Sequence, residues 1–174
     1  MATSYQSSAN DVNAASRSSA RSGASGSRGR KAPKVVTRRN PYTEPGKLPD
    51  FHRNSSPRIC TLNVRTLSAT GAATLLSAEL WKWGIQLAGL QEVRWPNSGE
   101  TTVNNTTFLW SGRQDGYRKE GVALALSSTL TSACVVWAPV SERLLFARFR
   151  HSLGHVSIVV CYAPTDDTPT AIKE

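Results

Sequence analysis

The stretch from residue 58 to residue 95 limits the fold of this chain most, because it reads as a strand, a helix and a second strand. Residues 57–64 are nearly continuously apolar, which predicts a strand covered on both faces. A helix is expected over 70–83, ended by Gly84, and a second strand over 85–92. Two parallel strands joined by a helix end at the same edge of a sheet.

The helix of this unit has candidate caps and an apolar stripe. Ser68 or Thr70 can cap its first turn. Residues at helical spacing form a mostly apolar stripe, made up of Ala72, Leu75, Leu76, Glu79, Leu80 and Trp83. We interpret Trp81 and Trp83 as packing residues rather than platforms on which bases stack.

Each strand of the unit ends in a polar residue, Asn63 after the first and Glu92 after the second. Open α/β sheets bind ligands at this edge, so a carboxylate and an amide are expected in one cleft that suits a hard cation and a phosphate. The alternative for Glu92 is an ordinary solvated carboxylate. Arg65 and Arg94, just beyond the strand ends, either meet phosphates or are surface charges.

Positive charge is concentrated in the first third of the chain. The 174 residues carry a net charge of +9, of which residues 1–55 supply +7. These residues are rich in Ser, Ala, Arg and Gly, which predicts a disordered basic tail, with 41–50 as an extended linker. The segment 28–39 is either a nuclear-import or nucleic-acid-binding patch or a solvated tail without a specific partner. A basic block favours phosphate-bearing partners.

The cysteines and the hydropathy pattern predict the compartment. Cys60, Cys134 and Cys161 lie in apolar runs without metal-ligand spacing, so we expect reduced cysteines that act as small core hydrophobes in an intracellular protein. The basic tail favours a nuclear location. No apolar run has the length of a membrane span, and the first twenty residues lack the apolar core of a secretory signal. No membrane partner is therefore expected.

Further strands follow the opening unit. They are predicted over 106–111, 121–127, 133–138, 142–150 and 156–162. Successive strands without helices favour antiparallel pairing on one side of the sheet, which gives a mixed α/β domain over residues 56–174. Seven apolar strands with a single covering helix indicate the N-terminal part of a larger domain.

Three arginines of these strands and the three histidines of the chain are further candidates for site residues. Arg143, Arg148 and Arg150 are interpreted as an exposed strand face rather than a nucleic-acid groove. His151 and His155 flank a turn and are expected at the surface, and His52 falls in the linker.

Six short motifs together resemble one known family. In order they are ICTLNVRTL, LAGLQEVRW, WSG, GVALAL, Ser-Glu-Arg at 141–143, and CYAPT, and they span about residues 57–167. This series resembles the endonuclease/exonuclease/phosphatase superfamily. Within this superfamily, the series of motifs most resembles the endonuclease domain of non-LTR retrotransposons. That group of domains includes the domesticated craniofacial development protein 2 group.

The resemblance implies a four-layer α/β sandwich, in which two packed mixed sheets are flanked by helices. It also implies Mg²⁺, with Mn²⁺ as a substitute, and hydrolysis of a phosphodiester, most typically in DNA. In that scheme Glu92 is the metal ligand, Asn63 orients the phosphate or a metal-bound water, and Tyr162 donates a hydrogen bond to a phosphate oxygen. Mg²⁺ suits such a site because it binds one or two carboxylates and keeps several waters.

Two later motifs of the family have no counterpart in the 174 residues, namely Gly-Asp-Phe-Asn and Ser-Asp-His. Leu62 also stands where the family often has Trp. Because loss of single catalytic groups commonly costs several powers of ten in rate, we expect a truncated endonuclease domain that does not cleave nucleic acid alone. One alternative is a non-catalytic remnant that binds nucleic acid through its basic tail. Another is an inert fragment that does not fold stably.

Overall fold

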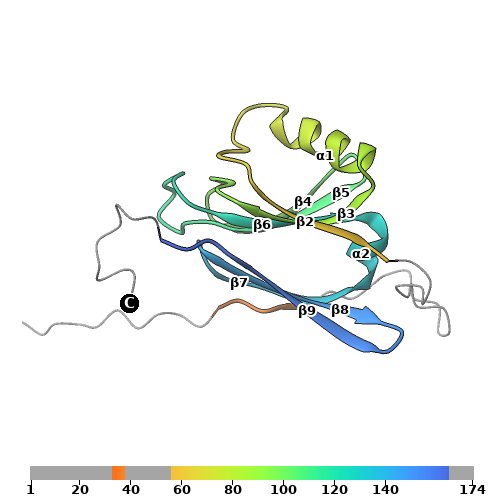
Figure 1. The fold of residues 1–174 in the computed structure, drawn as a ribbon. Helices are drawn as coiled ribbons and strands as arrows, with labels where there is room; N and C mark the ends of the chain where they lie inside the picture. Colours follow the sequence, from red (N-terminus) through yellow and green to blue (C-terminus); the bar gives the residue numbers. More distant parts are fainter. Residues whose placement is uncertain (1–32, 38–55, 165–174) are drawn as a thin grey trace, which may run out of the picture. The chain divides into compact units, whose positions relative to one another are not determined.

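The computed structural model describes residues 33–37 and 56–164. In these residues two β-sheets pack against each other, and a helix lies on the outer face of one of them (Figure 1). The elements in chain order are β1 (Val36–Thr37), β2 (Arg58–Asn63), α1 (Ala72–Lys82), β3 (Ile85–Gln91), β4 (Ser98–Val103), β5 (Thr106–Ser111), β6 (Val122–Ser127), α2 (Ser128–Ala133), β7 (Cys134–Ser141), β8 (Leu144–His151) and β9 (Gly154–Cys161). The fold is therefore mixed α/β and mostly strands.

The first sheet has the strand order β2-β3-β6-β5-β4. β2 and β3 run parallel, with Asn63 opposite Gln91, and the remaining neighbours are antiparallel. α1 connects the two parallel strands, so the predicted strand–helix–strand unit is confirmed. The left-handed backbone of Gly84, at φ 63°, ends the turn after α1, as glycine does readily.

The second sheet has the order β1-β7-β8-β9 and is antiparallel throughout. The prediction that the later strands pair within one sheet was wrong, because α2 carries the chain from β6 to β7 in the other layer. The side chain of Ser127 caps α2 by accepting a hydrogen bond from the Leu130 N–H at 3.4 Å. Neither α2 nor β4 was predicted.

A short strand also forms within the predicted basic tail. Val36 and Thr37 make β1, which pairs antiparallel with Val136 and Trp137 of β7. The sheet therefore begins before residue 56, where the domain was predicted to start. The rest of the predicted tail and linker, including His52, lies outside the described residues.

Two apolar cores hold the layers together. The core between the sheets contains Leu124 of β6 together with Leu145 and Phe149 of β8, all without solvent exposure. The second core lies between the first sheet and α1 and contains Leu90 and Phe108. Side chains alternate along β8 as predicted, since Leu145, Ala147 and Phe149 are all buried on one face.

α1 differs from the prediction in its cap and its buried face. Gly71 occupies the N-cap position at φ 83° without a side-chain cap, and the Ser68 hydroxyl instead donates to the Arg94 carbonyl at 3.1 Å. The helix buries Ser77 and Leu80. Trp81 and Trp83 are 79% and 63% exposed, so their interpretation as packing residues was wrong.

Each sheet has an exposed edge strand on the same side of the sandwich, because β9 packs against β3 and β6 while β2 lies beyond β3 (Figure 1). Ile59 of β2 is 57% exposed and Val159 of β9 is 53% exposed. The prediction that both faces of the first strand are covered was therefore wrong. No helix of the described residues is long and apolar enough to cross a membrane.

The cysteine prediction holds in part. No disulfide joins Cys60, Cys134 and Cys161. Cys134 is buried in the core between the sheets, and Cys60 is half-buried. Cys161 is exposed, because it lies on the edge strand β9, so its assignment to the core was wrong.

Candidate functional site

The site forms where β2 and β3 end. Asn63 is the last residue of β2, and Glu92 follows β3 with a left-handed backbone at φ 56°. Hydrogen bonds hold the residue on either side of Glu92, from Val64 N–H to the Gln91 carbonyl at 3.0 Å and from Val93 N–H to the Gly121 carbonyl at 3.1 Å. A left-handed conformation costs a non-glycine residue about 1–3 kcal/mol, and such conformations gather at functional sites.

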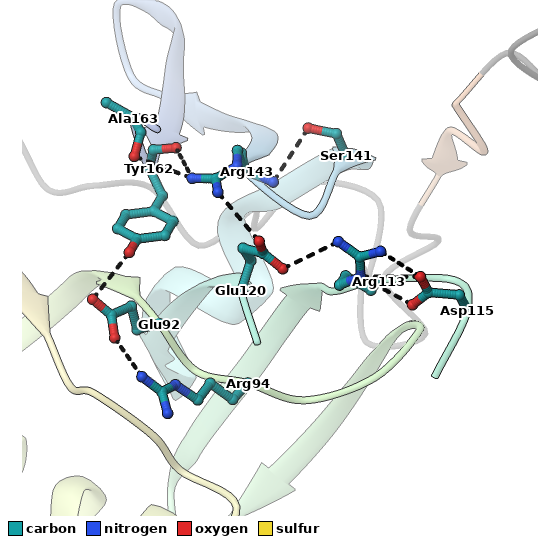
Figure 2. A network of polar contacts seen from close by, with 9 residues as sticks. All are labelled: Glu92, Arg94, Arg113, Asp115, Glu120, Ser141, Arg143, Tyr162 and Ala163. Atoms are coloured by element: carbon teal, nitrogen blue, oxygen red, sulfur yellow. Dashed lines mark hydrogen bonds and ion pairs between the residues drawn. The ribbon is translucent and has the colours of Figure 1, made fainter. Parts of the chain in front are cut away.

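Three predicted site residues meet at one carboxylate oxygen. Glu92 Oε1 accepts a hydrogen bond from Asn63 Nδ2 at 2.8 Å and another from the Tyr162 hydroxyl at 3.1 Å. Tyr162 directly follows β9, so it reaches Glu92 from the second sheet (Figure 2). The site is thus built by both layers of the sandwich and by residues up to 99 positions apart, from 63 to 162.

The other carboxylate oxygen of Glu92, Oε2, forms an ion pair with an arginine of the same chain. Arg94 Nη2 lies 2.9 Å from Glu92 Oε2, and Arg94 also has a left-handed backbone at φ 57° (Figure 2). Its Nε is buried and has no hydrogen-bond partner in the described part of the chain. Arg65 differs, because its side chain is exposed while its backbone N–H donates to Asn63 Oδ1 at 3.1 Å.

Hydrogen bonds and burial shift the pKa values of Glu92 and Tyr162. The pKa of Glu92 is lowered, first by the hydrogen bond from Asn63 and then by the one from Arg94. A lowered pKa in the folded state stabilises the fold above the ordinary carboxylate pKa, and this contribution is lost as pH falls through the folded value. The pKa of Tyr162 is raised, first by burial and then by its bond to Glu92, so Tyr162 stays a neutral donor.

The side chains of the site that could ligate a metal suit only some metals. Across residues 33–37 and 56–164, no three His, Cys, Asp or Glu side chains lie close enough together to hold a metal ion. A structural zinc site, which needs four protein ligands, therefore does not fit the described residues. Mg²⁺ and Mn²⁺ fit better, because one carboxylate can hold a hard cation whose remaining ligands are waters and substrate oxygens. Arg94 and such a cation would compete for the carboxylate of Glu92.

A second polar network adjoins Tyr162 and was not predicted. Arg143 contacts Tyr162 and Glu120, and Arg113 contacts Glu120 and Asp115 (Figure 2). The prediction of one exposed strip was wrong for Arg143 and Arg150, which are half-buried, whereas Arg148 of β8 is exposed as expected. The Ser-Glu-Arg turn was a signal that could have identified Arg143.

The two histidines of the described residues, His151 and His155, take no part in this arrangement. His155 is exposed and His151 is half-buried, where its Nδ1 accepts a hydrogen bond from the Leu153 N–H at 3.1 Å. His151 ends β8 and His155 lies in β9, so they flank the turn as predicted, but His151 is less exposed than expected. In the described residues the only ionisable groups hydrogen-bonded to Glu92 are Arg94 and Tyr162.

Comparison with known proteins gives a distant likeness. No family model matches the chain. Craniofacial development protein 2 of Bos taurus is 26% identical over 107 residues, which cover 62% of this chain and 18% of the relative. The protein of the same name from Tragulus javanicus is 25% identical over 107 residues, with the same coverage. The chain thus spans less than a fifth of the length of these curated relatives and is distantly similar to that part of them.

Proposed function

We propose that this chain carries part of the active site of a Mg²⁺-dependent phosphodiester endonuclease of the endonuclease/exonuclease/phosphatase type, with DNA as substrate. The observation that supports it is the convergence of Asn63 and Tyr162 on Glu92. The family resemblance predicts these three residues as site residues. In the fold, the Asn63 and Tyr162 side chains each lie within 3.1 Å of Glu92 Oε1, although the three residues follow or end separate strands of two sheets.

The chemistry of each residue suits this reaction. Glu92 supplies the one carboxylate that a water-rich Mg²⁺ requires. Asn63 and Tyr162 are neutral donors, and they can hydrogen-bond phosphate oxygens without adding charge. Arg94 supplies a planar guanidinium that can pair with a phosphate once it leaves Glu92. A bound Mg²⁺ would polarise the phosphoryl oxygen and lower the pKa of its waters.

We further propose that these residues are the N-terminal part of a four-layer domain. β2 and β9 leave the two sheets open on the same side, and apolar side chains such as Ile59 and Val159 are exposed there. Strands added at both edges would cover them and bring in the Gly-Asp-Phe-Asn and Ser-Asp-His motifs. In this proposal the 174 residues alone bind metal but do not cleave DNA.

Mn²⁺ binding tests the site directly. We expect Arg94→Met to raise the affinity of the full chain for Mn²⁺ about tenfold, because it removes the cation that competes for Glu92; tenfold corresponds to about 1.4 kcal/mol. Paramagnetic broadening of NMR signals near residue 92 measures this. Arg65→Met is the matched control, since it removes the same charge from another left-handed residue at the same sheet edge and should change affinity little.

Glu92→Gln completes this test. The amide keeps the size of the side chain but loses the charge that attracts the cation, so Mn²⁺ broadening around residue 92 should disappear. Glu79→Gln, on the exposed side of α1, should leave it unchanged. Equal Mn²⁺ broadening in Glu92→Gln and the wild type would contradict the proposed site.

The uneven charge of the chain favours a second candidate function, in which the basic N-terminal residues hold nucleic acid without catalysis. We expect binding of a DNA duplex to weaken steeply with salt and to weaken markedly when residues 1–32, which hold five Lys/Arg against one acid, are deleted. The deletion stops there because β1 belongs to the second sheet. Fluorescence anisotropy across a salt series measures this, and binding that the deletion does not weaken would count against it.

A further inference from the structure

We propose that Glu120 and Arg143 are positioning residues that hold the Tyr162 hydroxyl against Glu92. This inference rests on the proposed function, because it assigns to these two residues the alignment of a group in that site. Neither residue contacts Glu92, and both act through Tyr162 (Figure 2).

Glu120 is a buried anion fixed between two guanidinium groups. It is 7% exposed and lies at the end of the loop before β6. Its Oε1 accepts from Arg143 Nη2 at 3.2 Å, and its Oε2 accepts from Arg113 Nη1 at 3.4 Å. A buried carboxylate is unfavourable unless it is paired on both oxygens, so this pairing fixes where Arg143 lies.

Arg143 in turn fixes Tyr162 by its backbone and by its ring. Arg143 Nη1 donates to the Tyr162 carbonyl at 3.3 Å and to the Ala163 carbonyl at 3.1 Å. The Tyr162 N–H donates to the Arg143 carbonyl at 2.9 Å. The guanidinium also lies 4.9 Å from the centre of the Tyr162 ring, a cation–π distance. These contacts hold the backbone and the ring of Tyr162, whose hydroxyl donates to Glu92 Oε1 at 3.1 Å.

Arg113 and Asp115 complete the charge balance of the network. Asp115 pairs with Arg113, and this lowers the pKa of the Asp115 carboxyl to about 2. Asp115 therefore remains ionised at neutral pH and offsets the charge of Arg113. Glu120 is left to offset Arg143, so removal of the Glu120 charge acts mainly on the arginine that holds Tyr162.

The test reads the position of the Tyr162 ring without using activity. The full chain is labelled with 3-fluorotyrosine, and the Tyr162 signal in the fluorine NMR spectrum is assigned with Tyr162→Phe. In Glu120→Gln this signal should broaden and move toward its position in the urea-unfolded chain. Binding of a short DNA duplex in Mn²⁺ should weaken about tenfold in the same variant, or about 1.4 kcal/mol.

Matched variants separate positioning from general damage. Glu142→Gln removes a neighbouring acid outside the network, and Arg148→Lys changes an exposed arginine of β8, so both should leave the Tyr162 signal in place. If Glu120→Gln does not fold, Arg143→Lys decides the question. It keeps the charge but loses the planar group that contacts two carbonyls and the ring.

The outcomes distinguish the two proposals. A Tyr162 signal unchanged in folded Glu120→Gln and Arg143→Lys overturns the positioning role, whether or not the chain binds Mn²⁺. A signal that moves in both variants supports the role. If it moves while the wild-type chain shows no Mn²⁺ binding at Glu92, the arrangement around Tyr162 stands and the metal-dependent function is overturned.

Discussion

Replacing Phe149 with alanine is expected to lower the free energy of unfolding by about 3–5 kcal/mol. Phe149 has no solvent exposure and fills the core between the two sheets. Its strand β8 lies between β7 and β9, so the neighbours are held on both sides and can collapse little into the cavity left by the ring. Urea unfolding followed by circular dichroism measures the loss.

Phe146→Ala is the control for this prediction. Phe146 lies on the same strand but on its opposite, half-buried face, so a smaller loss is expected. Equal losses in the two variants would contradict the assignment of the core. The wild-type chain must also show one cooperative transition, and a gradual change without a transition would instead favour an inert fragment that does not fold stably.

The positions of Asn63 and Glu92 could be predicted because they follow from local pattern and one topological rule. Apolar runs identify the strands, and a helix between two strands makes them parallel. The polar residues at the two strand ends must then share an edge, as found. Tyr162 was placed by the family resemblance, because nothing local to CYAPT indicates which sheet edge it reaches.

Features that depend on tertiary neighbours could not be predicted in this way. The apolar run of β2 looks like a central strand, yet Ile59 is exposed because β2 has only one neighbour in the described sheet. Glu120 lies in a polar, glycine-bounded loop and would be expected in solvent. It is buried only because Arg113 and Arg143, distant in sequence from each other, approach it from two sides.

A chain extended with a segment that carries the Gly-Asp-Phe-Asn and Ser-Asp-His motifs is expected to nick supercoiled plasmid DNA in Mg²⁺. Glu92→Ala in that chain should lower the nicking rate by at least about a thousandfold, as loss of single catalytic groups commonly does. The reason is that Glu92 is the one carboxylate of the described site available to hold the cation, which contributes several kcal/mol to stabilising charge in the transition state. Conversion of supercoiled to open-circular plasmid on a gel measures the rate.

Two comparisons decide what such a result means. Glu79→Ala removes an exposed carboxylate of α1 and should leave nicking unchanged, whereas undiminished nicking in Glu92→Ala would show that the added segment holds the cation by itself. The 174-residue chain should not nick the plasmid even when it binds Mn²⁺, because we propose that the groups that position and deprotonate the attacking water lie in the added segment. Binding without cleavage in the short chain, and cleavage that depends on Glu92 in the long one, would place the cation site in these residues and the general base in the added ones.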